Sequence, residues 1–113
     1  MLAKRAMDGY VVMMTTVEKD KDGEKIAKVL VKERLAACVQ VLGPMTSTYR
    51  WKGKVNVSSE HLLLVKTRQG LCEEVADAIR RTHPYEVPEI IALPMLGGSS
   101  DYLVWISKET RWQ

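Results

Sequence analysis

Residues 38–67, CVQVLGPMTSTYRWKGKVNVSSEHLLLVKT, decide the fold of this chain. Apolar and β-branched residues alternate with polar ones on both sides of Lys52-Gly53, where glycine can adopt the positive φ of a tight turn. The stretch therefore predicts a long antiparallel hairpin. Gly43-Pro44 and Ser58-Ser59 break the alternation, so we expect the hairpin to be interrupted at both places.

One strand and one helix are predicted before the hairpin. Residues 10–16 (YVVMMTT) are apolar on both alternating faces, which is typical of an interior strand. Ile26 and Leu30 belong to an apolar set at helical spacing that follows. Asp20 and Asp22 could each cap this helix, and we place its start near Asp22.

A second helix and another strand are predicted after the hairpin. The helix has a stripe of apolar residues at i, i+4, i+7 and i+8: Leu71, Val75, Ala78 and Ile79. Pro84 must end it, because proline lacks a backbone donor and clashes with the preceding turn. A strand over residues 89–95 lies between Pro88 and Pro94, which places it at an edge of the sheet.

A third helix is predicted after Gly97-Gly98, with Ser99 or Ser100 as its cap. Its apolar stripe is Tyr102, Leu103, Trp105 and Ile106. The order is then β-α-β, β-α-β and a terminal helix. This is the split βαβ, or ferredoxin-like, arrangement of the α+β class, with helices on one face of an antiparallel sheet.

The composition indicates one soluble domain. The 113 residues are 46% hydrophobic and 27% charged, so we expect a single domain over residues 1–113 with a disordered tail at 1–9. The apolar runs are far shorter than the ~20 residues that cross a bilayer. Lys4 and Arg5 precede no apolar stretch, so we expect no secretory signal and a cytoplasmic location. A net charge of +3 is too small to predict a nucleic-acid partner.

The most unusual segment is 83–89, HPYEVPE, in which two prolines stiffen a loop carrying an imidazole, a phenol and two carboxylates. His83 and Glu89 could ligate a metal ion or act as an acid and base pair. Alternatively, His83 caps the end of the second helix and the prolines only form a turn.

Other metal ligands are few. The chain has no CxxC or HxxxH pair, and Cys38 and Cys72 lie in core-like patterns, where we expect reduced thiols. Any metal bound by sulfur with nitrogen and oxygen donors would be copper or zinc rather than magnesium. Lys66 interrupts the apolar run of its strand, so it either reaches solvent or pairs with Glu89 or a ligand in a cleft.

Aromatic and basic residues mix in residues 49–54, YRWKGK. Along a strand Tyr49 and Trp51 share one face while Arg50 points to the other, which does not suit a nucleic-acid stacking platform. Such an aromatic strand end more often marks a protein interface.

Several of these segments, in this order, resemble the CutA family of divalent-cation tolerance proteins: ERLAACV at 33–39, YRWKGK at 49–54, LLVKT at 63–67, HPYEVPEI at 83–90 and DYLxW at 101–105. The resemblance implies a tight homotrimer, a role linked to copper and other divalent cations, and no catalytic activity or organic cofactor. Independently of the resemblance, pairing the exposed hairpin edges around a three-fold axis would satisfy their backbone groups, and we expect this interface to bury Tyr49, Trp51 and Trp105. Where some members have a cysteine and a second histidine at their copper site, this chain has Met14 and Thr82, so only His83 matches.

We therefore expect a non-catalytic trimer that binds divalent cations weakly through His83 with Glu89 or Cys38. Two alternatives remain open. The trimer could bind a small molecule or anion in a cleft with Lys66 and Tyr85, or it could be a structural scaffold for a protein partner.

Overall fold

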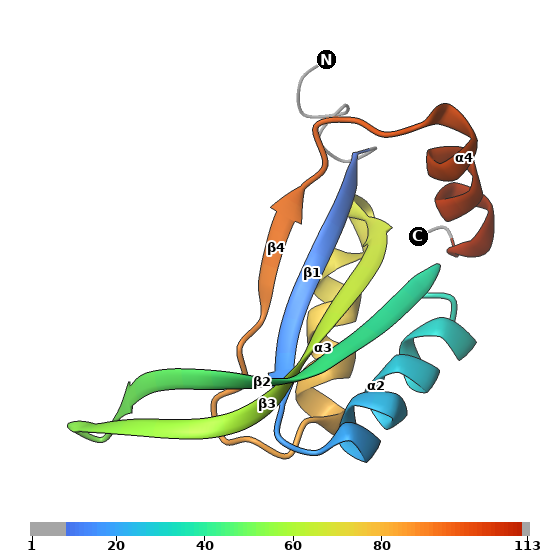
Figure 1. The fold of residues 1–113 in the computed structure, drawn as a ribbon. Helices are drawn as coiled ribbons and strands as arrows, with labels where there is room; N and C mark the ends of the chain where they lie inside the picture. Colours follow the sequence, from blue (N-terminus) through green and yellow to red (C-terminus); the bar gives the residue numbers. More distant parts are fainter. Residues whose placement is uncertain (1–8, 112–113) are drawn as a thin grey trace.

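The computed structural model describes residues 9–111, so nearly all of the predicted tail at 1–9 lies outside the described residues. In chain order the elements are β1 (Tyr10–Val17), α2 (Asp20–Lys32), β2 (Cys38–Trp51), β3 (Lys54–Arg68), the short 3-10 helix η1 (Gln69–Leu71), α3 (Cys72–Thr82), β4 (Ile91–Pro94) and α4 (Ser100–Glu109). The strands form one antiparallel sheet in the order β2-β3-β1-β4. Helices α2 and α3 lie against one face of it (Figure 1). The predicted ferredoxin-like order is confirmed.

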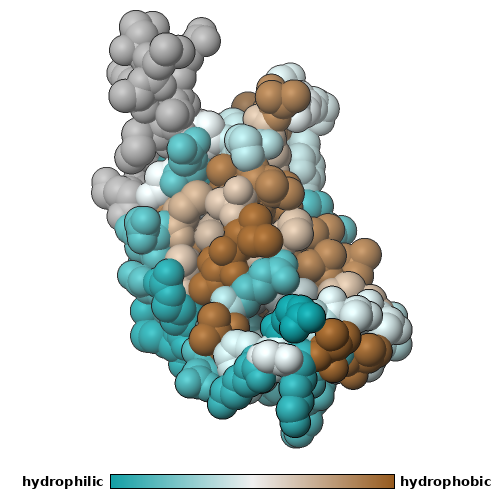
Figure 2. All heavy atoms as spheres, turned by 90° about the vertical axis from the view of Figure 1, so that its left-hand side faces the viewer, coloured by the Kyte–Doolittle hydropathy of each residue, from teal (hydrophilic) through white to brown (hydrophobic). Residues whose placement is uncertain are grey.

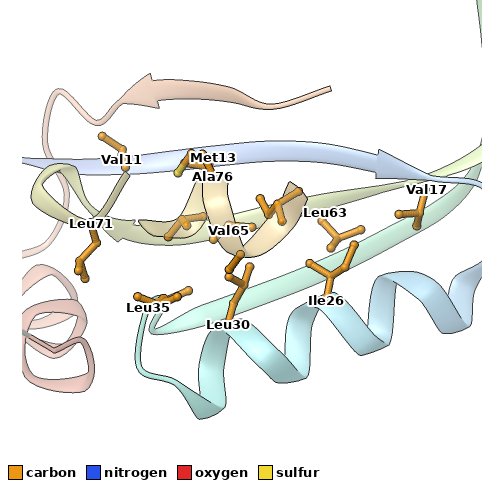
Figure 3. Packing of buried hydrophobic residues seen from close by; sticks show 14 residues of the cluster. Val11, Met13, Val17, Ile26, Leu30, Leu35, Leu63, Val65, Leu71 and Ala76 are labelled. Carbon is orange, nitrogen blue, oxygen red and sulfur yellow. The ribbon is translucent and has the colours of Figure 1, made fainter. Parts of the chain in front are cut away.

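The core lies between that face and the two helices. Alternate residues of β1, such as Val11 and Met13, are buried there, as are Leu63 and Val65 of β3. The helices add the apolar residues that the helical spacing predicted: Ile26, Leu30, Val75, Ala78 and Ile79. Figure 3 shows these side chains meeting between the layers. Since burying one aliphatic side chain contributes about 1.5–3 kcal/mol, this layer fixes the helices on the sheet.

The hairpin is interrupted in its pairing at Gly43-Pro44, as predicted, but the interruption predicted at Ser58-Ser59 is wrong. Strands β2 and β3 pair throughout except between Leu42 and Met45, where Gly43 and Pro44 stand opposite the single residue His61. Such a β-bulge bends a strand without ending it. Gly43 has a φ of +152°, and a Cβ at this position would lie 2.7 Å from Cδ2 of His61. Glycine therefore permits the close approach of the two strands.

Helix α2 begins at Asp20, two residues before the predicted start at Asp22, so Gly23 lies inside its first turn. A Cβ on Gly23 would lie 3.2 Å from side chains of both Val17 and Leu63. The missing side chain lets the start of the helix approach the sheet, and this outweighs the weak helix propensity of glycine.

The remaining differences concern strand lengths. Ser58 and Ser59 do not break β3, because they pair regularly with Ser47 and Thr46 of β2. The predicted strand at 89–95 is shorter, since β4 spans only Ile91–Pro94. It does lie at an edge of the sheet, as the flanking prolines predicted.

Helix α4 is held at its C-terminus by two arginines. Arg34, which follows α2 with a φ of +59°, donates from Nε to the Glu109 carbonyl at 3.2 Å and from Nη2 to the Lys108 carbonyl at 2.5 Å. The buried Arg68 donates from Nε to Oγ1 of Thr110 at 2.9 Å. These guanidinium groups satisfy oxygens at the negative end of the helix dipole.

The second face of the sheet carries apolar residues that neither α2 nor α3 covers. We call them the uncovered face: Val12, Met14, Leu42, Leu62, Leu64, Ile91 and Leu93. Figure 2 shows hydrophobic side chains gathered on this side of the molecule. Strands β2 and β4 are the two edges of the sheet. None of the helices within residues 9–111 has the length and apolar character needed to cross a bilayer.

Candidate functional site

A groove of about 600 Å³ lies between the hairpin and the chain that follows α3. Its lining residues come from the end of β1, from the hairpin and from segment 85–89: Thr16, Ser47, Thr48, Tyr49, Trp51, Glu60, Tyr85, Glu86, Val87 and Glu89. Helix α3 ends at Thr82, just before Pro84, and the chain then crosses the end of β1. The volume is typical of a small-molecule pocket.

His83 anchors this crossing through both nitrogens of its ring. The backbone N–H of Tyr85 donates to Nδ1 at 3.1 Å, so Nδ1 carries a lone pair. Nε2 lies 2.7 Å from the Thr16 carbonyl oxygen, which can only accept, so Nε2 carries the proton. Burial lowers the pKa of His83, while the Thr16 carbonyl and the charges of Asp22 and Glu60 oppose that shift. The imidazole is thus neutral, in one defined tautomer.

Tyr85 and Glu60 form the centre of the groove. The Tyr85 hydroxyl donates to Oε2 of Glu60 at 2.7 Å, and the Tyr85 ring meets the His83 ring edge-on with centroids 4.7 Å apart. Burial first, and then the hydrogen bond and charge of Glu60, raise the pKa of Tyr85. The phenol therefore stays protonated and acts as a hydrogen-bond donor.

Glu60 is the functional residue that sequence reasoning missed. Glu60 is only 8% exposed. The two preceding serines had led us to expect an interruption of the strand at this point. The bulge places Glu60 opposite Met45. His61 separates Glu60 from the apolar residues of β3. A carboxylate at the edge of the run HLLLVKT was the available signal, but its burial depends on the path of segment 85–89.

The groove is acidic and aromatic. Glu60, Glu86 and Glu89 supply carboxylates, and no lysine or arginine is among the described residues that line it. Tyr49 and Trp51 are 44% and 42% exposed. The hydroxyl of Tyr49 also accepts a hydrogen bond from Oγ of Ser58 at 3.2 Å, which fixes its ring on the hairpin.

The predicted site residues separate into two regions. Tyr85 and Glu89 line the groove and His83 adjoins it, whereas Cys38 and Lys66 pair with each other across β2 and β3. In the register Lys66 is level with Val12 of β1, four residues from Thr16, which amounts to about 13 Å along the strand. Within one chain the structure therefore does not bring Cys38 or Lys66 to His83.

Lys66 has its own partners at that distant end. Its Nζ donates to Oε1 of Gln40 at 2.6 Å and lies 6.0 Å from the ring centroid of Tyr102 on α4. Trp105, the third predicted interface residue, is on the same helix with 39% of its surface exposed. In the part of the chain that the structure describes, no three His, Cys, Asp or Glu side chains are close enough to hold a metal ion together.

Comparison with known proteins finds similarity along most of the chain. The family model described as CutA1 divalent ion tolerance protein matches residues 11–109. The Arabidopsis thaliana protein called "Protein CutA, chloroplastic" is 46% identical over 101 residues, which are 89% of this chain and 56% of that protein. The Thermus thermophilus "Divalent-cation tolerance protein CutA" is 44% identical over 99 residues, 88% of this chain and 96% of that protein. The chain thus spans little more than half of the plant relative.

Solved structures show the same fold. A divalent cation tolerance protein (Cut A1) from Thermus thermophilus superposes with a TM-score of 0.88 at 43% identity, covering 90% of this chain and 99% of the other. CutA1 from Oryza sativa superposes with a TM-score of 0.91 at 37% identity, covering 96% and 99%.

Proposed function

We propose that this chain, which belongs to the CutA1 divalent ion tolerance family, is a non-catalytic homotrimer that binds copper and other divalent cations weakly beside His83. The observation that carries the proposal is the charge of the groove. Glu60, Glu86 and Glu89 line it without a described lysine or arginine among them. Carboxylate oxygens and imidazole are common ligands of divalent cations.

The arrangement of the donors supports weak rather than tight binding. Both ring nitrogens of His83 are already hydrogen-bonded, to the backbone of Tyr85 and of Thr16. A cation that used this imidazole would have to displace one of these partners. Glu89 is exposed and keeps its carboxylate free to reach an ion in the groove. Cys38 as a ligand stays a prediction from the sequence.

The trimer is supported by what the single chain leaves unpaired. No other strand within residues 9–111 pairs with the outer edges of β2 and β4, and an apolar area adjoins both through Leu42 and Leu93. Pairing one edge with the other edge of the next copy is a heterologous contact, and such contacts form a ring when the rotation between copies closes. The number three is what the family resemblance implies. Tyr49 and Trp51 on the projecting hairpin would become buried in such a ring.

The anion-binding alternative has less support. It required Lys66 and Tyr85 in one cleft, but Lys66 is held by Gln40 at the other end of the hairpin. The groove itself repels anions because of its carboxylates. A scaffold for a protein partner would use the uncovered face, which the proposed trimer already occupies.

Calorimetric titration with Cu(II) and Zn(II) tests the metal site. We expect weak binding by the wild type and weaker binding by His83→Ala and Glu89→Gln. His61→Ala is a matched control, because His61 lies on β3 and does not line the groove. Identical isotherms for wild type and both site variants would remove this site from the molecule.

A further inference from the structure

We propose that the outward face of α2 is a docking surface for an acidic helix of a partner protein. The partner's carboxylates would lie along four lysines, which we call the lysine row: Lys21, Lys25, Lys28 and Lys32. This interaction uses neither the groove nor His83. It therefore goes beyond the metal response proposed above and does not require it.

The lysine row is a narrow stripe along the helix. Its members are four, three and four residues apart, which confines them to about 60° of the helix circumference over a length of about 16 Å. All four are exposed, whereas the buried residues of α2, Gly23, Ile26 and Leu30, lie on the opposite side. The row therefore points away from the sheet.

The proposed trimer leaves this face open. Helix α2 lies against one side of the sheet, and the uncovered face is the other side (Figure 1). The sheet and the body of α2 both separate the lysine row from the uncovered face. Assembly through that face and the strand edges therefore does not bury the row.

The charges of the lysine row are not neutralised within the described chain. None of the four lysines forms an ion pair with a carboxylate of residues 9–111. Like charges three and four residues apart repel each other on a helix, so the row opposes the stability of α2. Helix α3 differs, because its exposed Arg80 pairs with Asp77 at 3.0 Å. An anionic partner along α2 would supply the missing opposite charges.

The hollow beside the row favours a protein over a uniform polyanion. Its volume is about 410 Å³, and Glu24 and Val29 line it together with the four lysines. A partner helix can place a basic side chain opposite Glu24 and an apolar one against Val29. The phosphates of a nucleic acid or an anionic membrane would repel that carboxylate. No aromatic residue is among the described lining residues, so nothing there stacks on bases.

The uneven spacing of the row fits a helical partner. Helices that pack side by side match residues at alternating steps of three and four, as in the seam of a coiled coil. Carboxylates at i, i+4, i+7 and i+11 of the partner can therefore lie level with the four lysines in either chain direction. An extended strand presents side chains to one face at equal steps of about 6.7 Å, which does not match the shorter middle step.

Calorimetric titration with synthetic peptides, in EDTA and at low salt, tests the proposal. The first peptide is an alanine-rich helix of about 20 residues with glutamates at i, i+4, i+7 and i+11. The second has the same composition, but its glutamates are spread around the helix. We expect the first to bind at least about threefold more tightly, because only it aligns every carboxylate with a lysine.

Lys25→Gln combined with Lys28→Gln removes the two central charges of the row. This double variant should bind the first peptide at least about fivefold more weakly. The matched control combines Lys52→Gln with Lys54→Gln. It removes two charges from the hairpin turn, which lies far from α2 (Figure 1), and should bind like the wild type.

A charge swap tests the position of the contact. Lys25→Glu combined with Lys28→Glu gives Lys21 and Lys32 each an oppositely charged neighbour at i,i+4, which favours a folded α2. The variant should lose the first peptide and bind one with lysines at the two central positions and glutamates at the outer two. That pattern reads the same in both directions, so the result does not depend on the orientation of the partner.

Equal affinities for the two acidic peptides would overturn the proposal, and so would equal binding by the Gln double variant and its control. Oligothymidine and phosphatidylserine vesicles form parallel arms of the experiment. Tighter binding of either one than of the first peptide would assign the row to a nucleic acid or a membrane and contradict the proposal. Failure here is distinct from failure of the metal site, because EDTA removes free metal ions from every titration.

Discussion

The hydroxyl of Tyr85 donates a hydrogen bond to the buried carboxylate of Glu60 across 2.7 Å. The bond ties the proline-rich segment after α3 to the middle of the hairpin, two parts of the chain that the sheet does not join. The Tyr85 ring also packs edge-on against the His83 ring. The hydrogen bond to Glu60 therefore helps to position the side chains along one wall of the groove.

Tyr85→Phe should destabilise the protein by about 1.5–3 kcal/mol, the usual range for a hydrogen bond to a charged group. The substitution leaves a buried carboxylate without its donor. Urea unfolding at one fixed protein concentration measures the change. Tyr102→Phe is the control, since no described residue forms a hydrogen bond with that hydroxyl, and its unfolding curve should match the wild type. Equal losses for both variants would show that the Glu60 contact is not stabilising.

The pH dependence of stability should reveal the neutral state of His83. Burial lowers the pKa of this residue below its ordinary value of 6.5, so on acidification the unfolded chain takes up the proton first. The stability contributed by the neutral ring is present above that value and is lost as the pH falls through the lowered folded pKa. Wild type should therefore lose more stability than His83→Gln between about pH 7 and pH 5. Parallel losses would contradict the assignment, and nitrogen NMR shifts of the ring report the tautomer directly.

Gly43→Ala should cost about 1–3 kcal/mol, the typical cost of a strained backbone position. The new Cβ would lie 2.7 Å from Cδ2 of His61, at a φ of +152° that side chains other than glycine's rarely adopt. Gly97→Ala is a matched control, because a Cβ there meets no atom within 4 Å. Thermal unfolding of the two variants should differ clearly. A Gly43→Ala protein as stable as Gly97→Ala would mean that the bulge can relax.

Arg34→Ala should loosen α4, because it removes the donors to the Lys108 and Glu109 carbonyls. Each lost hydrogen bond costs about 0.5–1.5 kcal/mol. Amide hydrogen exchange in α4 should become faster while the β1 and β3 amides stay protected. Arg80→Ala removes an exposed arginine whose bond to Asp77 is a surface ion pair, and such pairs contribute little. It should leave the exchange of α4 unchanged.

Leu93→Asp should disrupt the proposed trimer. Leu93 is 47% exposed at the edge strand β4, so a charge there should not destabilise the single subunit. The same charge buried in an apolar contact between copies would be costly. Light scattering should give three times the 12.8 kDa chain mass for wild type and a lower mass for the variant. Leu96→Asp, at a fully exposed loop position, should remain like wild type. A wild-type mass equal to one chain would refute the trimer itself.

The sequence predicted the order of the helices and strands because the apolar periodicity of each one can be seen within its own segment. Helix α3, with Val75 and Ile79 buried, and the edge position of β4 are examples. The hairpin was harder, since Gly43-Pro44 reads as a stop unless the partner strand is known to absorb the extra residue. Bulges are properties of two strands, and only the register reveals them.

The candidate site was predictable in part for the same reason. Tyr85 and Glu89 could be found because two prolines mark their loop as a rigid, unusual segment. Glu60 could not, because its burial comes from a segment 25 positions away. Lys66 was predicted on the correct strand. Its position opposite Cys38 depends on how β2 pairs with β3, which the composition does not reveal.

The hydrogen bonds from Arg34 and Arg68 to the C-terminal end of α4 affect which positions can vary during evolution. Arg34 and Arg68 hold main-chain oxygens of Lys108, Glu109 and Arg111, which every amino acid possesses. The side chains at those three positions can therefore be substituted without loss of these hydrogen bonds to the helix. Substitutions should therefore be tolerated at Lys108, Glu109 and Arg111, and not at Arg34, Arg68 and Thr110, whose side chains make the contacts.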